Sequence, residues 1–225
     1  MKRNLDKLID NKKRFYDEIT KSCILDVLEN ENISILKGFV NNIDNVRLFY
    51  EKVYSNIRKN PIVFCGINPG RNGAGITGVS FFDNTSLSKI ITSVIDDNNP
   101  EPSANFIWNV ISTYGKEIFF KNVYLTNICW FGFIKSGKNF NYHELPESIQ
   151  SKFFEGFIEE MESVQPHIIV PLGKKVYNDL IKMKQNDIFN WNISDRLNHP
   201  RWCNYPSRIN LWTENYIKII NKYKL

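Results

Sequence analysis

The sequence lacks any apolar run near the roughly 20 residues that a helix needs to cross a membrane. Its first seven residues, from Met1 to Lys7, also lack the apolar core of a secretory signal peptide. These two absences argue against a membrane-spanning or exported protein. We therefore expect a cytoplasmic protein that has no membrane partner.

Cysteine is scarce and irregularly spaced. The four cysteines are Cys23, Cys65, Cys129 and Cys203, and no two of them form a C-x-x-C pair. Zinc ligands usually come in such close pairs. We therefore expect reduced, structural cysteines rather than a metal or iron–sulfur site, and we expect no cofactor.

The charge balance and the composition exclude little. The chain has 225 residues, 42% of them hydrophobic, with 29 Lys and Arg against 24 Asp and Glu, for a formal net charge of +5. This mild excess permits a polyanionic partner without requiring one. Neither a repeat nor a Pro/Ser-rich linker divides the chain. We expect a monomer with one domain over residues 1–225, in which residues 1–60 form a helical lead-in packed on the rest.

The spacing of apolar residues predicts strands that alternate with helices. Short apolar runs bounded by Pro or Gly predict buried strands at residues 61–67, 123–128 and 167–173, with a weaker candidate at 193–198. Helical spacing occurs at residues 5–28, 44–58, 86–96, 103–114, 146–164, 174–184 and 207–222. This alternation predicts an α/β fold, a three-layer αβα sandwich with a central, mostly parallel four-stranded sheet.

Polar or Gly-rich residues follow each predicted strand. In chain order they are Asn68-Pro69-Gly70, Thr126-Asn127, Gly173-Lys174-Lys175 and His199-Pro200-Arg201. Open α/β sheets bind ligands at the carboxyl ends of their strands. These four segments are therefore predicted to meet in one crevice.

Residues 66–82 are rich in glycine, which lets a backbone approach a ligand closely. The stretch is not a phosphate-binding P-loop, and it is not a G-x-G-x-x-G segment that opens a helix. It contains no carboxylate. By itself such a stretch favours a plain loop with tight turns over a binding site.

Three motifs in the sequence resemble those of a known protein family. Gly66-Ile67-Asn68-Pro69-Gly70 and, after a Gly-rich span, Thr77-Gly78-Val79-Ser80-Phe81 resemble the G-M-N-P-G…T-G-V-P-F motif of the single-strand-selective monofunctional uracil-DNA glycosylases. His199-Pro200-Arg201-Trp202 resembles the second motif of a bacterial branch of this family, a short H-P-R followed by an aromatic residue. Asn127-Ile128-Cys129 is similar to the family's middle N-Y-C. The resemblance covers about residues 60–220.

The resemblance implies an enzyme of base excision repair that hydrolyses the bond between uracil and deoxyribose in single- or double-stranded DNA. Asn68 would position the attacking water. His199, as neutral imidazole, would donate a hydrogen bond to the charge that develops on uracil O2. The amide of Asn127 would read uracil N3–H and O4. Phe81, or the adjacent Phe82, would stack on the base.

The resemblance also implies a substrate-binding set and a set of DNA contacts. Gly66, Ile67, Pro69, Gly70 and Ala74 complete the substrate-binding residues. A Met stands in the place of Ala74 in better-known relatives, so a preference for modified, 5-substituted uracils stays open. The expected DNA contacts are Arg201, Trp202, Lys174 and Lys175, and the residue that fills the emptied site in the duplex stays open. Residues 135–142 mix basic and aromatic side chains, which suits a DNA-facing loop or an ordinary surface loop.

Two other functions stay open. One is a glycosylase for another damaged base such as xanthine or hypoxanthine, and the difference would lie at Asn127, Phe81 and Ala74. The other is a non-catalytic nucleic-acid binder on the same fold. The joint presence of Asn68 and His199 counts against that second reading.

Overall fold

The computed structural model describes the backbone of residues 2–224 and the side chains of residues 5–224. Its central sheet has three parallel strands in the order β3-β2-β6. They are β2 (Ile62–Gly66), β3 (Val123–Asn127) and β6 (Ile168–Pro171). Every residue in them is buried, as expected for strands covered on both faces. The strands predicted at 61–67, 123–128 and 167–173 are confirmed.

The prediction of a fourth strand is wrong. Residues 193–198 run parallel to β6, but they form only two isolated bridges, Ile169–Ile193 and Leu172–Leu197. The charged Asp195 and Arg196 between them are exposed. A continuous ladder buried on both faces would bury these charges at a high cost. The segment nevertheless carries the chain to His199, beside the carboxyl end of the sheet.

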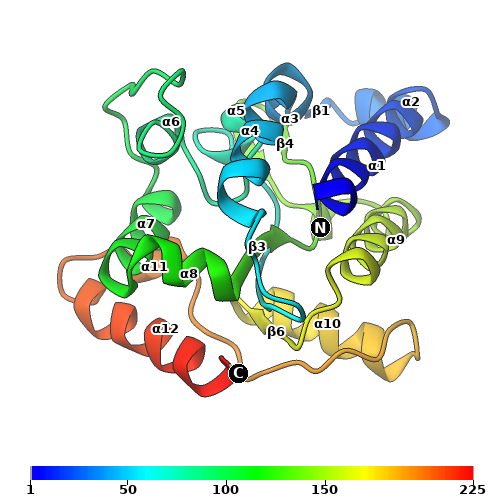
Figure 1. Ribbon diagram of the computed structural model, residues 1–225. Coiled ribbons are helices and arrows are strands. Elements are labelled where there is room, and N and C mark those ends of the chain that lie inside the picture. Colours follow the sequence, from blue (N-terminus) through cyan, green and yellow to red (C-terminus); the bar gives the residue numbers. More distant parts are fainter. Residues whose placement is uncertain (1, 225) are drawn as a thin grey trace.

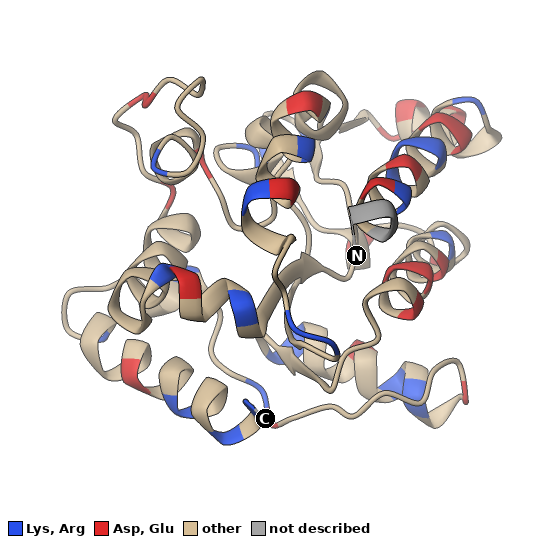
Figure 2. Cartoon of the chain, viewed as in Figure 1, with Lys and Arg blue, Asp and Glu red and all other residues tan. Residues whose placement is uncertain are grey.

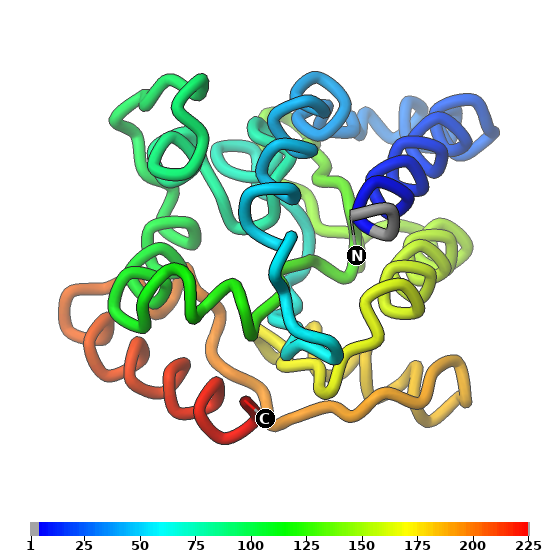
Figure 3. The backbone as a smooth tube through the Cα atoms, viewed as in Figure 1, coloured from blue at the N-terminus to red at the C-terminus, as the bar shows by residue number. Residues whose placement is uncertain are grey.

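Helices cover both faces of the sheet (Figures 1 and 3). On one face, Phe64 of β2 packs on Phe119 and Tyr216, which belong to α8 (Lys116–Asn122) and α12 (Ile209–Tyr223). Successive strand residues point to opposite faces. On the other face, the hydroxyl of Tyr124 donates to Glu160 of α9 (Glu147–Val164), and α1 (Lys2–Thr20) packs on α9.

Most of the predicted helices are present. They are α4 (Ile43–Tyr54), α7 (Pro102–Tyr114), α9, α10 (Lys174–Gln185) and α12. The helix predicted at 5–28 is two helices, α1 and α2 (Cys23–Asn30). They separate at Ser22, whose hydroxyl accepts the backbone N–H of Ile24 and caps α2.

The helix predicted at 86–96 is wrong. Only α6 (Asn84–Leu87) forms there. Asp97 accepts a hydrogen bond from the amide of Asn84 at 3.0 Å, and Asp96 accepts one from the hydroxyl of Thr85 at 2.7 Å. Asp96 and Asp97 also accept the backbone N–H groups of Asn98 and Asn99, two residues further on, and local bonds of this kind compete with helix formation. They close the segment into a loop.

The sequence analysis missed a second, antiparallel sheet, with strands in the order β1-β4-β5. They are β1 (Ile33–Ile35), β4 (Phe133–Lys135) and β5 (Lys138–Phe140). Ser136 and Gly137 join β4 to β5 with positive φ angles of 51° and 71°, as tight hairpin turns require. Short helical turns complete the chain: α3 (Gly38–Asn41), α5 (Ala74–Thr77), α11 (Pro200–Cys203) and the 3₁₀ turn η1 (Tyr142–Glu144).

Charge is unevenly distributed (Figure 2). Acidic residues predominate on α2 and α9, whereas basic residues predominate on α10 and α12. A polyanionic partner would therefore meet less repulsion on the side of α10 and α12. Within the described residues, no helix has the combination of length and apolar character that a membrane span requires.

Candidate active site

A cavity of about 340 Å³ opens at the carboxyl ends of β2 and β3. Segments that are far apart in the sequence line it: Ile67, Asn68, Pro69, Gly70, Gly73, Ala74, Phe81, Glu101, Ser103, Asn127, Asn139, Asn141, His199 and Arg201. Three of the four segments predicted to meet in one crevice line this cavity, whereas Gly173, Lys174 and Lys175 are not among its lining residues. The cavity brings together Asn127 at the end of β3, Asn68 just after β2, and His199, which follows the extended segment 193–198.

Gly66, the last residue of β2, forms part of the floor beside this cavity. A Cβ atom placed there would lie 2.4 Å from Oδ1 of Asn127 and 2.5 Å from Cζ of Phe81. Both distances are well below van der Waals contact. Glycine at this position thus lets the amide and the aromatic ring approach the same stretch of backbone.

The two neighbouring phenylalanines point to different places. Phe81 lines the cavity, and its φ angle is +64°, a left-handed conformation that a bulky side chain rarely adopts. Phe82 is buried in the core, with its ring 4.9 Å from that of Phe49. The hydroxyl of Thr77 donates to the carbonyl of Phe82 at 2.6 Å and holds the turn. Of the two, Phe81 is therefore the one that lines the cavity.

Asn127 ends β3 and is almost fully buried. Its Nδ2 donates to Oγ of Ser80 at 3.3 Å. Ser80 stands where the resembled motif has proline, so the sequence departs from the motif at the residue that contacts Asn127. The contact occupies one of the two amide hydrogens. The other amide hydrogen and Oδ1 have no hydrogen-bond partner among the described residues.

Asn68 follows β2 in a loop. Its Nδ2 donates to the carbonyl of Pro69 at 3.2 Å, and its Oδ1 accepts the backbone N–H of Tyr142 at 3.3 Å. A carbonyl oxygen has two lone pairs. One lone pair of Oδ1 therefore stays available for a water molecule.

His199 is the N-cap of α11. Its Nδ1 accepts the backbone N–H of Arg201 at 3.2 Å, and Pro200 occupies the first helical position, where its missing N–H costs nothing. Because Nδ1 accepts, the proton of neutral His199 is on Nε2. Burial and the nearby Arg201 guanidinium lower the pKa of His199 to about 4. The imidazole is therefore a neutral donor near pH 7.

The predicted DNA contacts are spread over the surface. Arg201 is exposed and lines the cavity. Trp202 is 42% exposed and lies outside the lining, with the guanidinium of Arg208 3.9 Å from its ring centroid. Lys174 is exposed at the start of α10, whereas Nζ of Lys175 lies 3.1 Å from the carboxylate of Asp179. The ion pair of Lys175 leaves it less suited to bind phosphate.

Sequence reasoning missed several lining residues. Glu101 lines the cavity and brings a carboxylate to it, whereas the Gly-rich segment contains no carboxylate. The carboxylate oxygens of Glu101 also cap α7, because they accept the backbone N–H groups of Ser103 and Ala104. Asn139 and Asn141 reach the cavity from the hairpin side. The Glu101-Pro102 pair before a helix was a visible capping signal. Asn139 and Asn141 belong to residues 135–142, which the sequence analysis interpreted as a DNA-facing loop or an ordinary surface loop from their basic and aromatic residues, without singling out the two asparagines.

Among the described residues, no three His, Cys, Asp or Glu side chains gather as a metal ion would require. All the described cysteines are free thiols. Burial raises the pKa of Cys65 and of Cys129. Cys65, Cys129 and Cys203 are buried, which fits the structural role predicted for them, whereas Cys23 is exposed.

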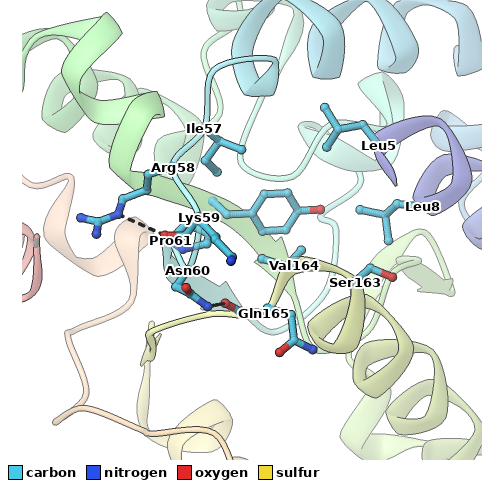
Figure 4. Close-up of a pocket in the computed structure, with 11 residues that line it drawn as sticks. Leu5, Leu8, Ile57, Arg58, Lys59, Asn60, Pro61, Ser163, Val164 and Gln165 are labelled. Atoms are coloured by element: carbon cyan, nitrogen blue, oxygen red, sulfur yellow. Dashed lines mark hydrogen bonds between the residues drawn. The ribbon is translucent and has the colours of Figure 1, made fainter. Parts of the chain in front are cut away.

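A second cavity, of about 230 Å³, lies at the opposite end of the sheet (Figure 4). Leu5 and Leu8 of α1 face it from one side. Nδ2 of Asn60, before β2, donates to the carbonyl of Gln165, after α9, at 2.8 Å. Among the described residues that line it there is no Asp, Glu or His, and the amide of Asn60 is engaged with Gln165, so the first cavity is the stronger candidate for a catalytic site.

Comparisons with known proteins agree with this geometry. The model of the uracil DNA glycosylase superfamily matches residues 53–221. A crystal structure of wild-type SMUG2 from Pedobacter heparinus matches with a TM-score of 0.69 and 27% sequence identity, over 85% of this chain and 88% of that chain. No curated protein sequence matches.

Proposed function

The chain belongs to the uracil DNA glycosylase superfamily, and we propose that it hydrolyses the N-glycosidic bond of uracil in DNA as a step of base excision repair. The resemblance seen in three sequence motifs is confirmed at the level of the superfamily and by the likeness to SMUG2. The observation that carries the proposal is the convergence of Asn68, Asn127 and His199 on one cavity. Those three side chains supply an acceptor for water, an amide that can read a base, and a neutral donor.

The cavity suits a base that has left the stack. A glycosylase must extrude its nucleotide and hold the base outside the duplex. Phe81 offers a ring for stacking, which is worth about 1–3 kcal/mol per base. Oδ1 of Asn127 would accept uracil N3–H, and Nδ2 would donate to O4. Cytosine presents the opposite pattern and would leave both groups mismatched.

The bond breaks as negative charge moves onto the base. Nε2–H of His199 would donate to uracil O2 and stabilise that charge in a site from which water is excluded. Oδ1 of Asn68 would orient the water that attacks the cationic sugar. No lysine is among the described residues that line the cavity, so water rather than a Schiff base is the proposed nucleophile. The enzyme would then be monofunctional.

The DNA strand would cross the surface next to His199. Arg201 lies at the cavity, and the following residues stack Arg208 between Trp202 and Tyr205, with its guanidinium 3.9 Å and 5.2 Å from the two ring centroids. Exposed aromatic and arginine side chains bind unpaired bases and phosphates. We propose that Arg201 and Trp202 contact the strand beside the extruded nucleotide, with Lys174 as a phosphate contact.

We also propose that the chain acts as a monomer with one glycosylase domain over residues 1–225. The helical lead-in supports the single domain, because α1 packs against α4, which is part of the same lead-in, and against α9. Since α9 lies within the matched region, the lead-in is packed on the rest of the chain.

The test is excision from oligonucleotides that carry one uracil, followed by alkali to cleave abasic sites. We expect cleavage with the wild-type protein and a loss of about 10²–10³-fold for His199→Ala, the range for one lost charge-stabilising donor. Asn68→Ala should lose most turnover while DNA binding persists. The control is Asn99→Ala, which changes an exposed asparagine in a loop. Wild-type protein without activity on uracil in either strand context would refute the proposal.

The same assay separates the alternatives. Oligonucleotides with xanthine or hypoxanthine test for another base, and excision of only those bases would replace uracil as the substrate. Tight binding of uracil-containing DNA without turnover would instead favour a non-catalytic binder.

A further inference from the structure

We propose that Tyr142 is a positioning residue that fixes the side-chain amide of Asn68 through its backbone N–H, and that Asp179 anchors Tyr142 for this task. The inference rests on the proposed function for its catalytic consequence. Its structural part, the link from α10 through Tyr142 to Asn68, can be tested without any activity.

The first link joins Tyr142 to the cavity. Its backbone N–H is at the start of η1, where helical amides have no partner within the helix. This N–H donates to Oδ1 of Asn68 at 3.3 Å. A backbone N–H can only donate, so it selects the oxygen end of the amide. The contact therefore decides which end of Asn68 is held at η1 and leaves one lone pair of that oxygen for water.

The second link holds the η1 turn in place. Oε1 of Glu144 accepts the backbone N–H of Asn141 at 2.9 Å and its Nδ2 at 3.1 Å. Nε2 of Gln150, on α9, donates to the carbonyl of Leu145 at 2.7 Å. The turn that presents the N–H of Tyr142 is therefore tied to itself and to α9.

The third link fixes the ring of Tyr142, which is fully buried and packs edge-on against Phe154 at 5.8 Å. Its hydroxyl donates to Oδ2 of Asp179 on α10. Burial and the charge of Asp179 raise the pKa of Tyr142 far above its usual range, so the hydroxyl remains a donor. Oδ1 of Asp179 lies 3.1 Å from Nζ of Lys175, which balances the carboxylate charge.

These links connect α10 to an amide in a loop. The loop between Asn68 and Gly73 is not part of a helix or strand, so Asn68 depends on neighbours for its position. A displacement of about 1 Å at a reacting group can cost about 10²-fold in rate. Releasing the hydroxyl of Tyr142 should let η1 shift, and the amide of Asn68 should lose its orientation.

The test uses Tyr142→Phe and Asp179→Asn, which keep the size of each side chain. The matched control is Tyr177→Phe, which removes a partly buried hydroxyl from the same helix, α10. We expect the single-turnover excision rate to fall about tenfold in the first two variants. The affinity for DNA should stay unchanged, and the control should match the wild type. A loss of thermal stability with an unchanged rate would show a merely structural role and would overturn the proposal.

A double-variant cycle shows whether the effect passes through Asn68. Residues that act as a unit are not additive. In an Asn68→Ala background, Tyr142→Phe should therefore cause no further loss of rate. An equal loss in both backgrounds would contradict the link.

Amide hydrogen exchange tests the contact itself. The backbone N–H of Tyr142 should exchange slowly in the wild type and about tenfold faster in Asn68→Ala and in Asp179→Asn. Unchanged exchange in both variants would refute the link even if the enzyme is active. Conversely, a wild type that excises no uracil while these exchange rates change as expected would refute the proposed function and leave the link intact.

Discussion

The buried ion pair between Lys12 and Glu160 gives the sharpest prediction about stability. Nζ of Lys12 lies 2.6 Å from Oε1 of Glu160, and the two side chains are only 7% and 0% exposed. Burial works against the charge on Lys12, but Glu160 and then Tyr50 outweigh it, and the pKa of Lys12 is raised. Lys12 is therefore a buried cation whose main partner is one carboxylate. We predict that Lys12→Met strongly destabilises the fold.

The carboxylate of Glu160 also organises the end of β3. It accepts hydrogen bonds from the hydroxyls of Tyr124 and Thr126, at 2.7 and 2.8 Å, and from the indole N–H of Trp130 at 2.6 Å. Thr126 directly precedes Asn127 in the strand. In Lys12→Met these three neutral donors would remain, so the orphaned charge would keep some of its stabilisation.

The magnitude follows from these contacts. Breaking a buried pair by removing one partner costs about 3–5 kcal/mol. The three remaining donors to Glu160 argue for the lower end, about 3 kcal/mol, out of a typical total stability of about 5–15 kcal/mol. For a protein of this size 1 kcal/mol corresponds to about 2–4 °C in melting temperature, so we expect a fall of about 6–12 °C.

The assay is urea unfolding and thermal unfolding near pH 7, followed by circular dichroism and tryptophan fluorescence. Because the pKa of Lys12 is raised on folding, the pair contributes fully below the unfolded pKa, about 10.4, and its contribution is lost as pH rises through the folded pKa. Neutral pH therefore lies where the pair contributes fully.

The control is Lys13→Met, the same substitution at the next residue. Lys13 is exposed and pairs with Asp17 at 2.7 Å on the helix surface, where water screens the pair, so its loss should leave the free energy of unfolding nearly unchanged. A Lys12→Met variant that loses less than about 1 kcal/mol, or no more than the control, would contradict the reasoning about an unpaired buried charge.

Two further predictions concern the cavity. Gly66→Ala should lower the uracil excision rate by about 10²-fold, because the added Cβ would displace the side chains of Asn127 and Phe81. An unchanged rate would show that the close approach at Gly66 does not matter for catalysis. The excision rate should be flat through pH 6.5 and fall only towards pH 4, because the pKa of His199 is about 4. An inflection near 6.5 in a pH–rate profile would show instead that His199 titrates normally. The same lowered pKa means that the unfolded chain takes up this proton first, so stability should decrease as pH falls from 6.5 towards 4.

The sequence predicts those parts of the fold that depend on local patterns of apolar residues, and it fails where contacts between distant residues decide the structure. The strands around Val63, Tyr124 and Ile169 were predictable because strands buried on both faces need continuous apolar runs. The segment from Ile193 to Asn198 was wrongly predicted as a strand because its backbone is extended beside the sheet but forms only isolated bridges with it. The helix expected at 86–96 failed because Asp96 and Asp97 bond to Thr85 and Asn84, more than ten positions away, and a local sequence pattern does not show such pairs.

For the candidate site, the local sequence was sufficient wherever a motif is continuous in the chain. Asn68 lies in a long Gly-rich motif, and Asn127 and His199 follow strand candidates in the order that the resemblance requires. Strand direction alone then predicts that all three meet, since parallel strands end at the same edge of a sheet. The roles of these residues stay predictions until the variants are assayed.

The sequence by itself therefore determined the strand order along the chain, the edge at which the polar residues gather and the superfamily resemblance, because each depends on residues that are near one another in the chain. Only the tertiary structure decided that Phe81 and not Phe82 faces the cavity, that Glu101 reaches it, and that Tyr142 holds Asn68. Those outcomes depend on one positive φ angle and on contacts between segments tens of residues apart. Distant contacts of this kind leave no periodic trace in a single sequence.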